Sequence, residues 1–199
     1  VMLKNVFSKP EKHRIYLRQL FYEIENLGVN SVGIVVIISL FIGGIMTIQF
    51  AYALANPLYP AALVGLGTRD TLLLEFSSTM LALIMAGKIG SNITSEIGTM
   101  RVTEQIDSLE IMGINSASYL ILPKIIAVVF IFPFLYILSV FFGLLGGLFT
   151  GPLAGVITVP EYIDGIKWLF EPYYITFSII KSLFFGFLVA SVPAYFGYY

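Results

Sequence analysis

Long apolar runs separated by short polar stretches dominate the chain. Asp, Glu, Lys and Arg are absent from Ser31 to Thr68 and again between Lys124 and Glu161. An α-helix needs about 20 apolar residues to cross the roughly 30 Å hydrocarbon core of a bilayer. We therefore predict an all-α, polytopic membrane protein. It forms a single domain, 1–199, with about four transmembrane helices at residues 32–55, 72–93, 119–151 and 173–195.

The N-terminal stretch predicts an amphipathic helix over residues 8–28, capped by Ser8 with Glu11 and ended by Gly28. Its apolar residues recur at helical spacing, at Leu17, Leu20, Phe21, Ile24 and Leu27. Beside a span, such a helix is typical of one lying in the membrane interface. The alternative is a helix packed on the protein's own cytoplasmic face. Basic residues concentrate here, so the positive-inside rule predicts a cytoplasmic N-terminus.

Composition narrows the function classes. Only 12% of the 199 residues are charged, against about 25% in soluble domains, and 58% are hydrophobic. The net charge of -1 offers no basic patch for nucleic acid. The chain has no cysteine, one histidine and no Walker-type phosphate loop. We predict no catalytic residues and no metal site, so any ATP hydrolysis belongs to a partner.

Two ionisable residues fall inside predicted spans. Glu75 and Lys181 both lie in the outer half of inward-running helices, where they can pair. Ionisable residues within spans are functional candidates, although an ion pair that only orients the helices is an equal alternative. Gly143, Gly147, Gly151 and Gly155 repeat every four residues, a ridge that lets a helix of the same chain or of a second subunit approach closely.

The polar stretch from Ala86 to Asn115 stands apart from this apolar background. Gly98 loosens the preceding helix, and a new helix is predicted over residues 99–113, ended by Gly113. Val102, Ile106 and Leu109 share one of its faces, and Glu104, Asp107 and Glu110 line another. A solvated acidic face on a cytoplasmic loop is the plainest interpretation of this pattern.

The stretch AGKIGSNITSEIGTMRVTEQIDSLEIMGIN closely resembles the signature of the MlaE permease family, the membrane subunits of MCE-type ABC lipid transporters. The match is ungapped, and Ser108 replaces a common alanine. Leu74 and Ser78 stand where the family commonly has an arginine and a proline. Family members continue past the fourth span, so the sequence is expected to be truncated.

The resemblance implies that the polar stretch is a cytoplasmic coupling helix between spans two and three, which docks on an ABC ATPase. The residues it assigns to ATPase coupling are Glu96, Gly98, Thr99, Met100, Arg101, Thr103, Glu104, Gln105, Ile106, Asp107, Leu109, Glu110, Met112 and Gly113. In this role the acidic stripe meets basic side chains, and Ile106 and Leu109 are apolar anchors. Lipid-cavity candidates are Met46, Gln49, Glu75 and Lys181.

The resemblance also implies the assembly and its place. The permease is a homodimer in the bacterial inner membrane, with an MCE-domain periplasmic protein as a further partner. The ATPase binds ATP and Mg, and the cargo is phospholipid or a related lipid moved between inner and outer membranes. The alternative function is an ion-coupled secondary transporter that uses Glu75 and Lys181 and works without an ATPase.

Overall fold

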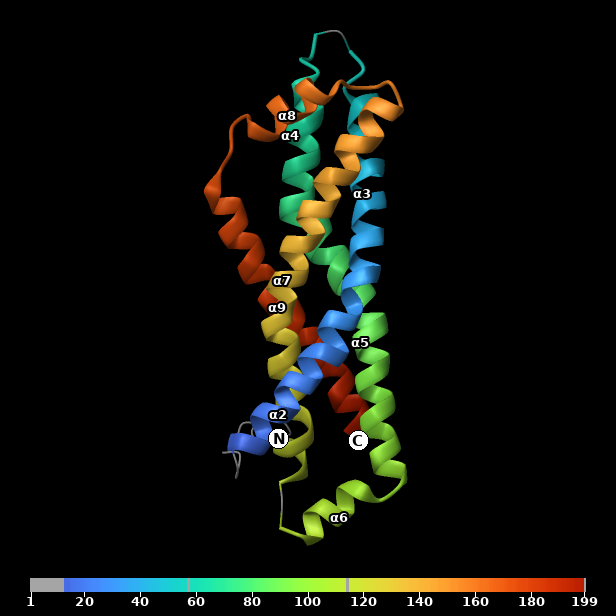
Figure 1. The fold of residues 1–199 in the computed structure, drawn as a ribbon, viewed down its shortest axis with the longest axis vertical. Helices are drawn as coiled ribbons and strands as arrows, with labels where there is room; N and C mark the ends of the chain where they lie inside the picture. The colour runs from blue at the N-terminus through green and yellow to red at the C-terminus, as the bar shows by residue number, and fades with distance from the viewer. Residues whose placement is uncertain (1–12, 57, 114, 199) are drawn as a thin grey trace. The chain divides into compact units, whose positions relative to one another are not determined.

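The computed structural model describes residues 13–56, 58–113 and 115–198 (Figure 1). Its elements are α2 (His13–Glu23), η1 (Ile24–Gly28), η2 (Val29–Ser31), α3 (Val32–Ala53), α4 (Ala62–Thr71), η3 (Leu72–Phe76), α5 (Ser77–Val102), α6 (Gln105–Ile111), α7 (Ser116–Leu153), α8 (Val159–Lys167) and α9 (Pro172–Tyr198). Here η1 and η3 are π-helical turns and η2 is a 3-10 turn. No strand occurs among these residues.

Four helical stretches in the described part of the chain are long and apolar enough to cross a membrane. They run over Tyr16–Ala53, Ala62–Val102, Ser116–Leu153 and Pro172–Tyr198. The all-α prediction with about four spans is therefore confirmed. The predicted capping residues Ser8 and Glu11 lie outside the described residues.

The prediction that Gly28 ends the N-terminal helix is wrong. The helix α2 continues through η1 and η2 into α3 as one helical stretch. Gly28 serves close packing instead, because a Cβ atom at this position would lie 2.5 Å from Cγ1 of Ile131. Leu17 and Phe21 are exposed, whereas the acidic side chain of Glu23 is buried together with Leu27.

The second predicted span, 72–93, begins too late, because the helical stretch that contains it begins with α4 at Ala62. The charges at Arg69 and Asp70 do not end the helix, since Arg69 is buried and its guanidinium is fully used. It donates to the carbonyl oxygens of Ile166 and Trp168, at 2.7 Å each, and pairs with Asp70 at 2.7 Å. Arg69 thereby satisfies backbone groups at the C-terminal end of α8.

The described residues fall into two compact units. The first unit contains residues up to Ser31, Ala82–Pro133 and Leu183 onwards, and the second contains Val32–Leu81 and Phe134–Ser182. Helices α5, α7 and α9 each contribute one part to each unit. We describe the units separately.

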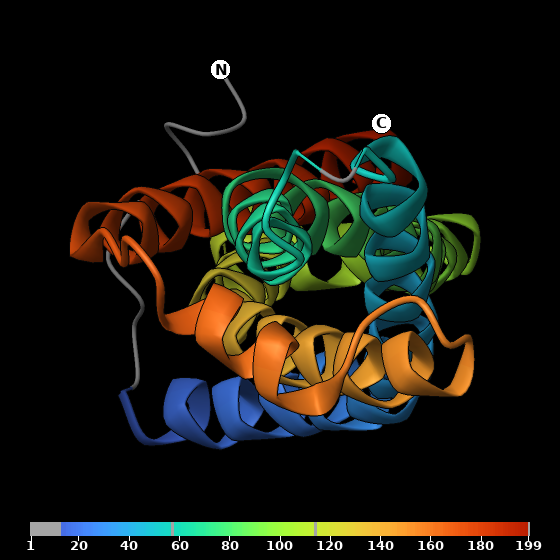
Figure 2. The ribbon, with the colours of Figure 1, turned by 90° about the horizontal axis from the view of Figure 1, so that it is seen from above.

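In the second unit, small residues let α3 and α7 approach closely. Cβ atoms built on Gly43 and Gly146 would collide with the backbone of Gly143 and Leu40, respectively. Ser39 and Ser139 are hydrogen-bonded at 2.8 Å in the same contact. Part of the predicted glycine ridge therefore packs within this chain. The short helix α8, orange in Figure 2, packs on α4, where Gly165 meets the backbone of Ala62.

In the first unit, the inner part of α5 supplies the core. Met85, Ile89, Ile93 and Ile97 recur every four residues and are each at most 1% exposed. Against this face packs the end of α9, where Gly197 lies close to Thr94 and where the hydroxyl of Thr94 donates to the carbonyl of Pro193 at 3.1 Å. Residues four positions apart lie on the same face of a helix. These four apolar side chains therefore form one buried face, although polar residues lie between them in the sequence.

Candidate functional site

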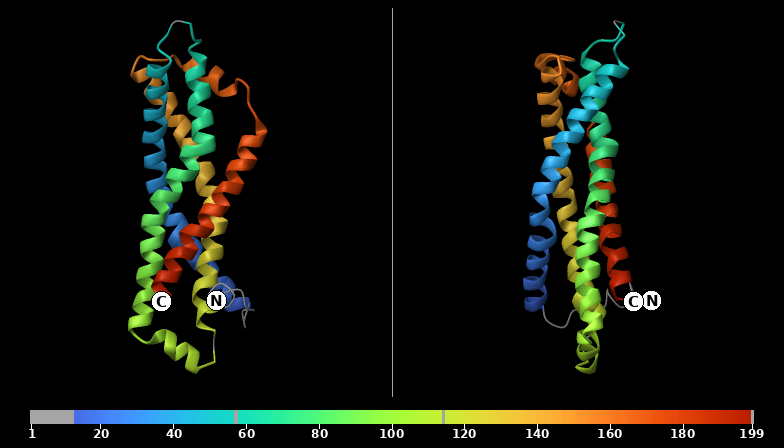
Figure 3. Two further views of the ribbon diagram at one scale, coloured as in Figure 1. Left: turned by 180° about the vertical axis from the view of Figure 1, so that it is seen from behind. Right: turned by 90° about the vertical axis from the view of Figure 1, so that its right-hand side faces the viewer.

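The predicted coupling segment forms a turn and a separate short helix. Helix α5 runs to Val102, past Gly98, where we predicted a break. The break comes instead at Thr103 and Glu104, and Figure 3 shows α6 after this turn. Glu104 has φ 58°, in the left-handed region that favours glycine. Its carbonyl oxygen accepts the first backbone hydrogen bond of α6, from the N–H of Ser108 at 3.0 Å, and a second one from the Oγ of Ser108 at 2.9 Å.

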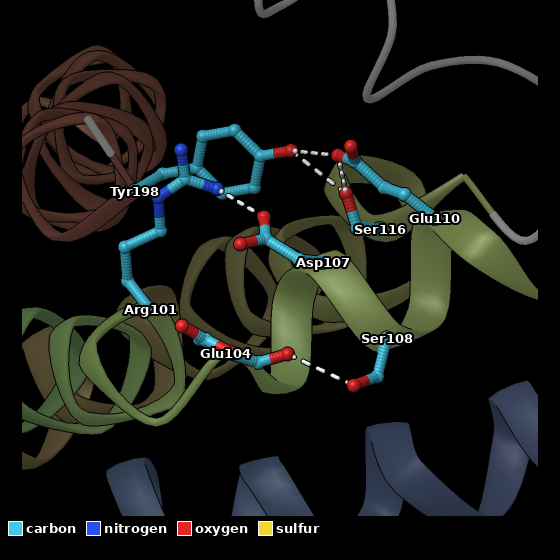
Figure 4. A network of polar contacts seen from close by, with 7 residues as sticks. All are labelled: Arg101, Glu104, Asp107, Ser108, Glu110, Ser116 and Tyr198. Carbon is cyan, nitrogen blue, oxygen red and sulfur yellow. Dashed lines mark hydrogen bonds and ion pairs between the residues drawn. The ribbon is translucent and has the colours of Figure 1, made fainter.

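Side chains brace α6 at both ends (Figure 4). At its start, Asp107 forms an ion pair with Arg101 from α5, at 2.9 Å. At its end, Oε1 of Glu110 accepts hydrogen bonds from Ser116 at 2.8 Å and from Tyr198 at 3.2 Å. Segments from α5, α7 and α9 thus hold one seven-residue helix.

The acidic stripe is therefore only partly available to a partner. Asp107 and Glu110 have partners within the chain, and the side chain of Glu104 is exposed. The three carboxylates of the stripe therefore have different surroundings. Glu110 opposes the helix dipole in the last turn of α6. Its hydrogen bonds with Ser116 and Tyr198 explain why an acidic residue stands at this position.

The side chain of Ile106, a predicted apolar anchor, is 0% exposed in this chain, so it packs inside the first unit. Leu109 is half-buried. The exposed apolar side chains are Val102 at 85%, Ile111 at 87% and Met112 at 63%. Sequence periodicity selected the correct face for Ile106 but could not say whether that face meets the same chain or another.

The other predicted coupling residues have local roles. Thr99 and Thr103 donate to backbone carbonyls four residues earlier, at 2.7 and 2.8 Å. Gly113 has φ 77°, a conformation that ends α6 without strain. Glu96, Thr99, Met100 and Gln105 line one cavity, and Gly98 lies beside the end of α9.

The sequence analysis missed a buried ionic triad in the first unit. The Nζ of Lys124 on α7 lies 2.6 Å from Oε1 of Glu23 and 2.7 Å from Oε2 of Glu96. The side chains of Lys124 and Glu23 are 1% and 2% exposed, and that of Glu96 is 35% exposed. A signal was present, because Glu23 lies three residues after Leu20 and four before Leu27, on the apolar face.

The second unit brings Glu75 and Lys181 together. Their Oε2 and Nζ atoms lie 2.8 Å apart, which confirms the predicted pairing. Glu75 is 66% exposed and Lys181 is 21% exposed. One carboxylate and one ammonium therefore share an accessible position within apolar helices, where an unpaired charge is costly.

Glu75 lies in the π-helical turn η3, whose carbonyl groups bond to side chains of other helices. The carbonyl of Leu73 accepts hydrogen bonds from Tyr136 at 3.0 Å and Ser178 at 2.7 Å. The carbonyl of Leu74 accepts one from Lys181 at 3.0 Å. Single π-turns inside helices often occur at functional sites, and these contacts fix this one. Tyr136 and Ser178 are further residues that the sequence did not single out.

Met46 and Gln49 lie on α3, where Met46 is half-buried and Gln49 is exposed. Of the four lipid-cavity candidates, the structure brings Glu75 and Lys181 into direct contact.

Comparisons with known proteins agree with this architecture. The model of the family described as Permease MlaE matches residues 20–199. A probable ABC transporter permease protein of Rickettsia bellii is 27% identical over 197 residues, covering 99% of this chain and 74% of that protein. The intermembrane phospholipid transport system permease protein MlaE of Haemophilus influenzae is 31% identical over 197 residues, covering 97% of this chain and 74% of that protein. The chain therefore belongs to the MlaE permease family.

Proposed function

We propose that this chain is the permease subunit of an ATP-driven transporter that moves phospholipid or a related lipid between the inner and outer membranes. Family membership and the name of the Haemophilus influenzae relative support the substrate class. The permease works as a homodimer in the bacterial inner membrane, with its N-terminus in the cytoplasm. A cytoplasmic ATPase binds ATP and Mg, and an MCE-domain protein receives or delivers lipid on the periplasmic side.

The observation that carries this proposal is the braced helix α6. A helix that transmits force must be attached to the helices that it moves. The fully buried Ile106 and the Glu110–Ser116–Tyr198 contacts attach α6 to the first unit. The Arg101–Asp107 pair contributes little, because both of its side chains are about half exposed. Closure of the ATPase then moves α6 together with the helices that hold it.

The ATPase contacts those residues of the coupling segment that remain exposed. Val102, Ile111 and Met112 supply exposed apolar area, and Glu104 supplies a carboxylate beside them. Apolar anchors surrounded by charge are typical of specific interfaces. We assign the docking role to these residues in place of Ile106.

The Glu75–Lys181 pair is the proposed lipid contact. A phospholipid headgroup carries an anionic phosphate, which an ammonium attracts strongly where water is scarce. Before a phosphate binds, Glu75 pairs with Lys181 at 2.8 Å. The hydrogen bond from Lys181 to the carbonyl of Leu74 in η3 keeps the two side chains in this position. Helix α5 directly follows η3 in the chain and ends at the coupling turn.

Co-purification tests this function. The protein is purified in mild detergent from cells that also express its neighbouring gene products, and mass spectrometry identifies bound proteins and lipids. An ATPase, an MCE-domain protein and phospholipid in the sample support the proposal. A chain that purifies without an ATPase and transports alone supports the ion-coupled alternative.

A further inference from the structure

A polar cavity of about 480 Å³, wide open to the surface, lies in the first unit beside the base of the coupling segment. Its polar lining residues are Asn26, Asn92, Ser95, Glu96, Thr99 and Gln105. They come from η1, from the last turns of α5 and from the first residue of α6. No lysine or arginine lines the cavity among the residues that the structure describes.

Glu96 belongs both to this cavity and to the buried triad. Its Oε2 atom accepts from Lys124 at 2.7 Å, and its side chain remains 35% exposed. Glu23, the other carboxylate of the triad, is 2% exposed and lies too deep for a group that enters from outside. Glu96 is therefore the point at which an incoming group reaches the triad.

The triad is short of one positive charge. Two carboxylates share a single ammonium, and Oε2 of Glu23 has no hydrogen-bond partner among the described residues. A cation held at Glu96 balances the charge of the two carboxylates.

The lining selects the kind of cation. A divalent metal prefers several carboxylates, whereas the lining contains one, Glu96, and no group of three acidic or histidine residues that could hold a metal occurs among the described residues. Amide and hydroxyl oxygens around a single carboxylate instead match a guanidinium, which carries a permanent charge and five donors in one plane. The cavity has room for one such side chain.

We propose that this cavity receives an arginine side chain of the ATPase subunit. This inference rests on the proposed function, because it takes the ATPase to dock at α6. The guanidinium contacts Glu96 and completes the charge of the triad, which joins α2, α5 and α7. Since Thr99 and Gln105 lie on either side of the coupling turn, the arginine contacts both α5 and α6.

The first test measures the affinity of the purified ATPase for the full permease in lipid nanodiscs. Glu96→Gln removes the charge but keeps the shape, and it leaves Glu23 and Lys124 as a neutral pair. Since hydrogen bonds to charged groups contribute about 1.5–3 kcal/mol, we expect a 10- to 100-fold loss of affinity. The loss should shrink at high salt. Glu25→Gln, which removes the same charge from an exposed site of η1, is the control and should bind normally.

A second variant separates shape from charge. Ser95→Trp fills the cavity without changing any charge and should reduce affinity as Glu96→Gln does. If both variants bind like the wild-type protein while the wild-type protein binds the ATPase, the arginine contact is wrong and the proposed function stands. If the wild-type protein binds no ATPase, the proposed function itself fails.

Cross-linking identifies the occupant directly. The sequence has no cysteine, so Ser95→Cys carries a benzophenone label at one site only. After illumination of the complex, mass spectrometry should find the label on an ATPase peptide next to an arginine. Cross-links to the basic N-terminal residues of this chain, or only to lipid, would overturn the proposal.

Discussion

Lys181 and Glu75 form a 2.8 Å ion pair between α9 and the π-turn η3. Lys181 also donates to the carbonyl of Leu74 at 3.0 Å, so the ammonium holds the backbone and the carboxylate of the same turn. The pair combines a nearly enclosed ammonium with a carboxylate that is 66% exposed. A group that competes for Lys181 can therefore displace Glu75 without unfolding the turn.

Neutralising either member of this pair should impair lipid transport more than assembly. Lys181→Met and Glu75→Gln should each lower the rate of ATP-driven phospholipid transfer several-fold, because the headgroup loses its cation or the cation loses its orientation. The exposed carboxylate makes the contribution to stability small. Transfer of fluorescent phospholipid between proteoliposomes and acceptor vesicles measures the rate. Wild-type rates in both variants would leave the pair with a structural role only.

Removing Lys124 should destabilise the first unit strongly. Lys124→Met leaves two carboxylates of the triad without a counter-charge, and such a loss typically costs about 3–5 kcal/mol. We expect a lower Tm in detergent by fluorescence-detected thermal unfolding. Lys167→Met, at an exposed position of α8, is the matched control and should unfold like the wild-type protein. Equal Tm values for both variants would show that the triad does not hold the unit.

Truncation of a buried and of an exposed apolar side chain in the coupling segment should have different effects on stability and on ATPase binding. Ile106→Ala removes a fully buried side chain, so we expect a loss of about 2–5 kcal/mol in stability. Ile111→Ala truncates a side chain that is 87% exposed and should leave Tm unchanged while weakening ATPase binding. Thermal unfolding and ATPase pull-down, run on both variants, separate the two roles. If instead Ile106→Ala weakened ATPase binding at an unchanged Tm and Ile111→Ala did not, the interface would lie on the Ile106 face.

Close packing of α3 on α7 should tolerate no side chain at Gly146. A Cβ atom there collides with the backbone of Leu40, which cannot move aside as a flexible side chain can. Gly146→Ala should therefore lower both Tm and the yield of folded protein. Gly33→Ala, on α3 with open space around its Cβ position, is the control. A stable Gly146→Ala variant would mean that the two helices can separate without loss.

The four spans could be predicted from the sequence because long apolar runs dominate each of them, although the second and the fourth carry Glu75 and Lys181. The boundaries were harder, since Arg69 and Gly28 carry local signals for a loop and a helix end. In each case tertiary contacts override the signal: Arg69 bonds to the end of α8, and Gly28 packs on Ile131. The Glu75–Lys181 pair was predictable because both charges stand alone in apolar helices.

The Lys124 triad and the burial of Ile106 were not predictable in the same way. Glu23, Glu96 and Lys124 are separated by 73 and 28 positions in the chain, and nothing in the spacing of these residues shows that the three side chains meet. Helical periodicity shows which residues share a face, but not what that face meets. The partner-facing residues of α6 therefore emerge only from the exposure of Val102, Ile111 and Met112.

ATP-driven phospholipid transfer by the reconstituted complex tests the central claim most directly. The permease, the co-purified ATPase and the MCE-domain protein are placed in proteoliposomes, and transfer is followed with and without ATP. We predict transfer that requires both ATP and the ATPase, and that is lost when Val102, Ile111 and Met112 are replaced together by alanine. Transfer at the same rate without the ATPase, or driven by an ion gradient alone, would contradict the account.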